Sequence, residues 1–155
     1  MKRTLLFVLA LVAAGCADAR QSALCEGLSV QSPLEDMRAC AEQGHARAQN
    51  GLGYMYDNGL GVPVVYAEAA RWYRLAAEQG YGDAQHNLGG MYELGEGVPQ
   101  DYVLAYMWLN LAVAQGIEAS QNRKDRVEQQ MTREQIDEAQ RMSREWLEAH
   151  PPGGN

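Results

Sequence analysis

The chain reads AEQGHARAQNGLGYMYDNGLGVP at residues 41–63 and AEQGYGDAQHNLGGMYELGEGVP at residues 77–99. The two stretches align without a gap at an offset of 36 residues. The match continues beyond them, where Tyr66, Ala69, Trp72 and Ala76 recur as Tyr102, Ala105, Trp108 and Ala112. A period of this length is typical of a solenoid, in which each unit buries its apolar face against its neighbours.

Each unit predicts a pair of antiparallel helices joined by a turn. Apolar residues at helical spacing predict helices over 46–57 and 66–79, and again over 82–93 and 102–115. Between the helices of a pair, glycines that tolerate positive φ precede a proline that cannot continue a helix. The expected fold class is therefore all-α, a short α-solenoid of antiparallel helix pairs.

Capping helices are expected on both sides of the full repeats, which span about 41–80 and 77–116. On the N-terminal side, Ser32 is predicted to cap a helix that ends at Gly44, and by register this helix is the second half of a truncated repeat. Beyond 116 the match fades. Helices are expected there over 118–130 and from Thr132 onward, where Thr132 and Gln135 form a capping-box pattern.

The first residues have the pattern of an export signal rather than of a folded element. A basic start precedes ten apolar residues at 5–14, too few to span a bilayer as a helix. One interpretation is a signal peptide over 1–19. The alternative is a lipoprotein signal over 1–15, with Cys16 lipidated as the mature N-terminus. The protein is therefore expected to be periplasmic or secreted, or membrane-anchored as a lipoprotein.

The rest of the chain divides into three parts. An N-terminal arm is expected over 20–31, the helical-repeat domain over 32–149, and a disordered tail over 150–155. Cys25 and Cys40 are the remaining thiols, and an exported protein meets an oxidising compartment in which they tend to pair. The alternative is that Cys40 is a small core residue, since it aligns with alanines in both full repeats.

Charge bears on the class of partner. The chain has a formal net charge of −7 and a pI near 4.9, which argues against nucleic acid because phosphate binding needs a basic face. Acidic residues outnumber basic ones in the repeats as well. This excess is consistent with solubility alone, or with a preference for a basic partner.

No pattern in the sequence indicates catalysis or metal binding. His45, His86 and His150 have no second ligand at metal-binding spacing. The serines lack an evident histidine or aspartate context, and the glycine pairs of the turns are not followed by the lysine of a phosphate loop. We therefore expect no catalytic residue, no metal and no cofactor.

A binding surface is predicted on the first helix of each pair. Leu52 and Tyr56 point to the core there, so polar positions between them lie on another face. These candidate binding residues are Arg47, Asn50, Tyr54, Asp83 and His86. They do not follow the repeat, as expected of residues that line the concave side of a helical-repeat protein. The competing interpretation is a face that is merely solvated.

The order of alanines, Leu-Gly, Tyr, Gly-x-Gly-Val-Pro, Asp-Tyr, Trp and Ala-x-x-Gly at this period resembles the Sel-one-like repeat, a relative of the tetratricopeptide repeat found in bacterial envelope proteins. The resemblance is dense over 41–116. It implies a right-handed superhelix whose concave surface binds proteins or peptides, in a family that mostly supplies adaptors and scaffolds.

The expected function is that of an exported, monomeric interaction module of the bacterial cell envelope, without enzymatic activity. Its membrane contact would be limited to a lipid at Cys16. Two alternatives remain. One is an envelope hydrolase like the β-lactamase-type relatives with a cysteine pair in every repeat, a pair that 41–116 lacks. The other is a structural subunit of an envelope complex.

Overall fold

The computed structural model describes residues 25–29 and 31–151. The predicted signal segment, the lipidation site Cys16 and most of the predicted tail lie outside these residues. Within them the chain forms seven α-helices and no strand. The helices are α2 (Leu34–Glu42), α3 (Ala46–Asn58), α4 (Tyr66–Glu78), α5 (Gly82–Leu94), α6 (Tyr102–Ala114), α7 (Ala119–Glu128) and α8 (Arg133–Ala149).

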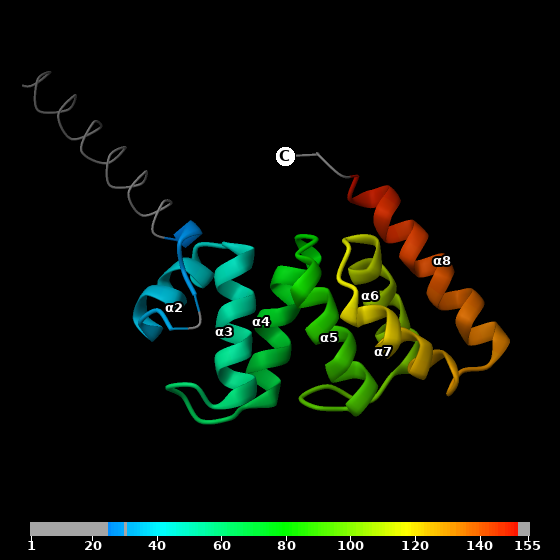
Figure 1. The fold of residues 1–155 in the computed structure, drawn as a ribbon, viewed down its shortest axis with the longest axis horizontal. Coiled ribbons are helices and arrows are strands. Elements are labelled where there is room, and N and C mark those ends of the chain that lie inside the picture. The colour runs from blue at the N-terminus through cyan, green and yellow to red at the C-terminus, as the bar shows by residue number, and fades with distance from the viewer. Residues whose placement is uncertain (1–24, 30, 152–155) are drawn as a thin grey trace, which may run out of the picture.

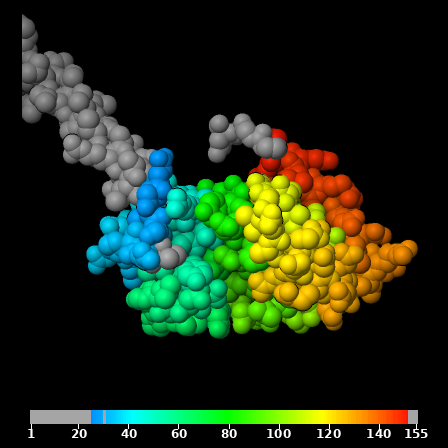
Figure 2. Space-filling view, viewed as in Figure 1, coloured from blue at the N-terminus to red at the C-terminus, as the bar shows by residue number. Residues whose placement is uncertain are grey.

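The helices follow one another along an elongated body, with α2 at one end and α7 and α8 at the other (Figure 1, Figure 2). Each end of the four repeat helices, α3 to α6, lies within one residue of the boundary predicted from the sequence. The all-α helix-pair solenoid is confirmed. We call α3, α5 and α7 the A helices and α4 and α6 the B helices.

Glycines bring the two helices of each pair close together. A Cβ placed on Gly53 would lie 2.7 Å from Cδ1 of Tyr73, and one placed on Gly89 would lie 2.7 Å from Cγ of Leu109. The A helix therefore presents bare backbone to a large side chain of its B helix. Tyr73 and Leu109 are fully buried as a result.

Two side-chain hydrogen bonds recur where each helix pair meets the preceding one. A buried glutamine near the start of the A helix donates to the backbone at the end of the preceding helix, and an arginine of that helix donates to a tyrosine of the A helix. The glutamine bonds are Gln49 to Ala41 O (3.1 Å) and Gln85 to Ala77 O (3.3 Å), and the arginine bonds are Arg38 to Tyr56 (3.2 Å) and Arg74 to Tyr92 (2.8 Å).

The core follows the predicted apolar positions with one exception. Ala69, Trp72 and Ala76 of α4 are buried, as expected. Tyr66 recurs in both repeats, which is typical of a core position, but it is 41% exposed. Its counterpart Tyr102, by contrast, is partly buried and packs against the core.

Two of the described helices have a side-chain N-cap, and the one at Thr132 was predicted from the sequence. The Asp101 carboxylate accepts the Leu104 amide at 3.0 Å, and Thr132 forms a capping box with Gln135. The prediction that Ser32 caps the first helix is wrong. Its hydroxyl instead accepts the amide of Ser29 at 3.0 Å, and α2 begins after Pro33 without a side-chain cap.

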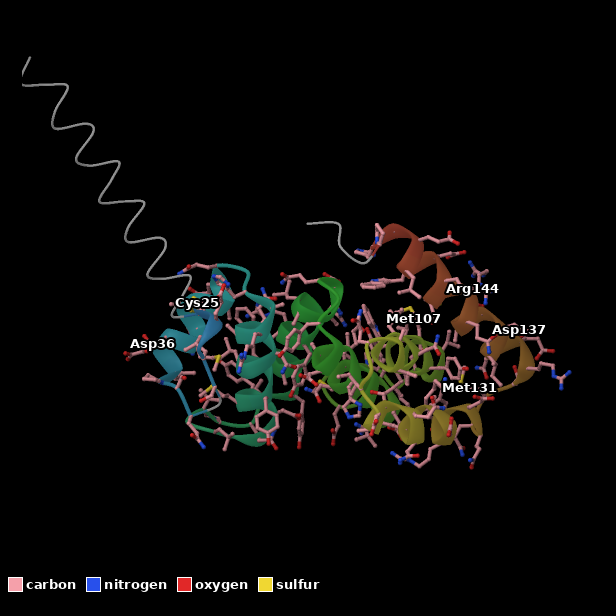
Figure 3. All side chains as sticks on the ribbon, turned by 45° about the horizontal axis from the view of Figure 1, so that its top comes forward. Cys25, Asp36, Met107, Met131, Asp137 and Arg144 are labelled. Carbon is pink, nitrogen blue, oxygen red and sulfur yellow. A yellow bond between two sulfur atoms is a disulfide. The ribbon has the colours of Figure 1, made fainter. Side chains whose placement is uncertain are left out.

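The disulfide between Cys25 and Cys40 is present and closes the N-terminal end of the array. Both half-cystines are buried, and Leu28 is buried with them beside α2. Figure 3 shows Cys25 at this end of the molecule, next to α2. The segment 25–29 thereby covers the apolar side of α2 that a preceding A helix would otherwise contact.

Helix α7 is a modified third A helix that ends the array. Ser120 and Val127 are buried at the positions of Ala84 and Met91, so the register of the repeat persists. Two residues on the side that would contact a B helix are charged. Asp125 stands where the repeats have Gly53 and Gly89, and Glu128 where they have Tyr56 and Tyr92.

Helix α8 does not pair with α7 but packs on α6. The Trp146 ring meets Trp108 edge-on at 6.3 Å between centroids, and His150 stacks on its other face at 4.2 Å. Asp125, Glu128 and Gln129 of α7 and Ile136 of α8 line a shallow pocket where the two helices diverge. A polar outer face of this kind terminates solenoids in general.

Candidate binding surface

The candidate surface is built by the three A helices, and we call it the A-helix face. It consists of Asn50, Tyr54 and Asp57 on α3, of Asp83, His86, Asn87, Gly90 and Glu93 on α5, and of Ser120, Arg123 and Arg126 on α7. Side-chain hydrogen bonds connect α5 to both neighbouring A helices. The face is therefore held in place by contacts among its own polar side chains.

The first of these contacts joins α3 to α5. The Asn87 amide nitrogen donates to the side-chain oxygen of Asn50 at 3.1 Å. Tyr54 lies one turn further along α3 and is 40% exposed. An exposed aromatic ring beside fixed amides offers both an apolar surface and hydrogen bonds, which are the two contacts that a bound polypeptide segment requires.

The five predicted residues do not form one cluster. Asn50, Tyr54 and His86 take part in the network or stand beside it. Arg47 donates to the backbone oxygen of Glu26 at 3.2 Å and so holds the N-terminal segment against α3. Asp83 is exposed in the first turn of α5.

The second contact joins His86 of α5 to Ser120 of α7, whose Nδ1 and Oγ atoms are 2.8 Å apart. This contact between a serine and a histidine is not apparent from the sequence, because 34 residues separate the two. Ser120 is fully buried at a position where the repeats have alanine. Since a buried hydroxyl cannot reach a substrate, this pair joins two helices and does not form a nucleophile–base dyad.

The third contact is ionic and was not predicted. Arg123 Nε donates to Glu93, and a second arginine, Arg126, lies 3.6 Å from the same carboxylate. A Cβ on Gly90 would lie 2.6 Å from Cζ of Arg123, so the guanidinium rests on the bare backbone of α5. The sequence feature that could have indicated this contact is Gly90, a glycine at the position where the first repeat has Tyr54.

Asp57 ends the face on α3. Its Oδ2 accepts the buried Tyr73 hydroxyl at 3.3 Å. Burial raises the pKa of the Asp57 carboxyl, and the Tyr73 hydrogen bond and the charge of Arg123 oppose this rise without cancelling it. The same burial, together with the nearby Asp57, raises the pKa of Tyr73, so the phenol remains protonated and donates.

Burial lowers the pKa of His86 below its ordinary value of 6.5, and the charge of Arg123 lowers it further, while Asp83 and Glu93 act in the opposite direction. The unfolded chain therefore binds the proton more readily. We expect the free energy of unfolding to fall as the pH drops from about 6.5 toward the lowered pKa of the folded state. Below that pKa, the protonation of His86 does not lower the free energy of unfolding any further.

The check is urea denaturation at pH 7 and pH 5 for the wild type and for His86→Gln, which retains a polar group facing Ser120. We expect the variant to lose less stability between the two pH values than the wild type does. His45→Gln is the control, because no side-chain hydrogen bond of His45 occurs in the described part of the chain, and it should behave as the wild type. Equal losses in all three proteins would contradict the assignment.

Across 25–29 and 31–151, no three His, Cys, Asp or Glu side chains gather closely enough to hold a metal ion. None of the helices in these ranges has the length and apolarity of a bilayer-spanning segment.

The fold and the A-helix face define a class of protein, the helical-repeat interaction modules. The Sel1 repeat matches residues 46–81 and 82–117, so each matched unit begins with an A helix. Comparison with solved structures agrees. A Sel1 repeat protein from Oxalobacter formigenes superposes with a TM-score of 0.57 at 44% identity, covering 59% of this chain and 68% of that one.

A second solved structure is c5321, a protective antigen of uropathogenic Escherichia coli with an SLR fold. It superposes with a TM-score of 0.73 at 34% identity and covers 77% of this chain. The chain spans only 26% of the length of that protein. No curated protein matches the chain. The chain belongs to the Sel1 repeat family, whose members are generally protein–protein interaction modules built on a typically non-catalytic scaffold.

Proposed function

We propose that the protein is an exported interaction module that binds a segment of a protein partner on its A-helix face. The observation that carries this proposal is the network across α3, α5 and α7. Asn50–Asn87, His86–Ser120 and Glu93–Arg123 hold polar groups in fixed positions on residues that do not follow the repeat. Side chains fixed in advance lose little entropy on binding, which favours recognition.

The remaining parts of the proposal come from the sequence. Residues 1–19 support export, and the pattern before Cys16 supports a lipid anchor as the alternative. The net charge of −7 favours a basic partner through long-range attraction. The closed ends, with the segment 25–29 on α2 and charged residues on α7, support a monomer that does not stack end to end.

The test is photo-crosslinking at two matched positions in the native host. A photoreactive phenylalanine replaces Tyr54 on the A-helix face or Leu75 on the B helix α4, which are 40% and 36% exposed. We expect a discrete crosslinked species from position 54 and none from position 75. Asn50→Ala and His86→Ala should each weaken that crosslink, because each removes part of the network.

The proposal is wrong if position 75 gives the same species with equal yield, or if position 54 gives none. Fractionation of the same cells tests export separately. Recovery of the mature chain in the envelope or the medium supports it. Recovery of the full-length chain in the cytoplasm contradicts it. Mass spectrometry of the N-terminus then distinguishes an acylated Cys16 from a chain that begins at Arg20.

A further inference from the structure

Asp57 and Glu93 occupy the same position in the two repeats, near the C-terminal end of the A helix, but only one has a cationic partner. Glu93 pairs with Arg123 and Arg126 of α7. The residue of α5 in register with Arg123 is Asn87, which bonds to Asn50 instead. In the described part of the chain, no cationic side chain lies within salt-bridge distance of Asp57, and its side chain bonds only to Tyr73.

The ion pair between Arg123 and Glu93 therefore shows which kind of partner, a guanidinium, the equivalent carboxylate of Asp57 could bind. In the second repeat, a guanidinium from the next A helix crosses the bare backbone at Gly90 and reaches the carboxylate. In the first repeat, Tyr54 takes the register of Gly90. An incoming guanidinium would meet an aromatic ring there, and arginine stacks on aromatic faces while it donates to a carboxylate.

We propose that Asp57, with Tyr54 one turn before it on α3, binds an arginine side chain supplied by the protein partner. This inference rests on the proposed function and names the chemistry of its ligand. Tyr54 precedes Asp57 by three residues on α3, so the ring and the carboxylate share one face of the helix. Asp57 accepts the hydroxyl of the buried Tyr73 at 3.3 Å, which holds the carboxylate in place.

Two further observations support a cationic ligand at this place. Burial raises the pKa of Asp57, and the charge of Arg123, which is not within salt-bridge distance, opposes this rise only in part. By contrast, the carboxylate of Glu93 has two arginines, so it is already neutralised within the chain. A basic partner is therefore expected to bind the carboxylate of Asp57 on α3, and not that of Glu93 on α5.

The test uses two capped pentapeptides, acetyl-Gly-Gly-Arg-Gly-Gly-amide and its citrulline analogue, which has nearly the same shape without the charge. They are titrated into the 15N-labelled protein, and amide shifts are followed by NMR. We expect the arginine peptide to bind in the millimolar range, up to about fivefold tighter than the citrulline peptide, since an exposed pair contributes up to about 1 kcal/mol. The shifted amides should centre on Tyr54, Asp57 and Asn87.

The decisive variant is Asp57→Asn, whose amide oxygen still accepts the Tyr73 hydroxyl. It should abolish the discrimination between the two peptides. Glu78→Gln is the control, because it removes the same charge from an exposed acid of the B helix α4, outside the A-helix face, and it should leave the discrimination unchanged. Asn87→Arg should also lower the affinity for the arginine peptide, by up to about fivefold, because it supplies an internal guanidinium in the register of Arg123.

Three results would overturn the inference. They are equal affinity of the wild type for both peptides, equal effects of Asp57→Asn and Glu78→Gln, and shifts that centre away from α3. Failure here is distinguishable from failure of the proposed function. If the crosslink at position 54 persists at full strength in Asp57→Asn, the arginine site is wrong and the A-helix face stands. If position 54 never crosslinks, the proposed function itself fails.

Discussion

The Gly97→Ala variant should be about 3 kcal/mol less stable than the wild type, a large effect for a single methyl group. Gly97 has a φ of +69°, where an alanine costs about 1 kcal/mol. A Cβ there would also lie 2.7 Å from the Ala67 amide nitrogen and closer still to the Tyr66 carbonyl. These are backbone atoms of the first turn of α4, so they cannot rotate away, and we expect overpacking to add about 2 kcal/mol.

The first repeat provides the control for this prediction. Gly61 has the same backbone conformation, with a φ of +72°, but its nearest neighbour for a Cβ is Cε of Met55 at 3.9 Å. The difference arises because α2 begins only at Leu34 and lacks the turn that α4 presents to Gly97. Gly61→Ala should therefore cost only about 1 kcal/mol. Urea denaturation measures both, and equal losses would contradict the packing argument.

Removing the disulfide should destabilise the protein by about 3 kcal/mol, the entropy expected for a closed loop of this size. The pair to replace is Cys25→Ala and Cys40→Ala, 15 residues apart. Alanine is suited to position 40 because both repeats have alanine in that register. The loss therefore reports mainly on the covalent bond and not on a cavity.

This loss should be local, because each unit of a solenoid contacts only its neighbours. In the double variant, hydrogen exchange should accelerate most in α2 and the start of α3 and least in α6. Reduction of the wild type with dithiothreitol under the same conditions is the control and should reproduce the pattern. Uniform acceleration along the chain would show that the end of the array unfolds together with the whole.

The repeat made α3 to α6 predictable from the sequence alone. Glycine, alanine and tyrosine recur at fixed positions in both units, so each unit independently confirms the assignment of the other. Features outside the two full repeats were harder to predict, because no second copy of the unit confirms them. Ser32 is followed by proline and glutamate in a capping pattern, yet Ser29 competes successfully for its hydroxyl. Within the repeats, Tyr66 recurs faithfully and is nevertheless exposed, whereas its counterpart Tyr102 packs against the core.

The binding surface was predictable only in part, for a related reason. Asn50, Tyr54 and His86 are non-repeating residues on the predicted helices, so the pattern indicated them. Arg123 lies beyond the repeats, and its role depends on the bare backbone at Gly90 and on the carboxylate of Glu93. Contacts between α5 and α7 span 30 residues or more. Residue spacing within one helix carries no information about them.

The charged residues of α7 determine how the molecule could be lengthened, in evolution or in the laboratory. Asp125 and Glu128 replace the glycine and tyrosine that receive a B helix, so a unit appended after α7 would find no apolar surface to cover. At the junction between α4 and α5, both helices keep the repeating residues that pack against a neighbouring unit. An additional copy of residues 46–81 should therefore be accepted when inserted after Tyr81. Additional repeats are therefore expected to be tolerated in the middle of the array. Each inserted repeat would add one more A helix to the A-helix face.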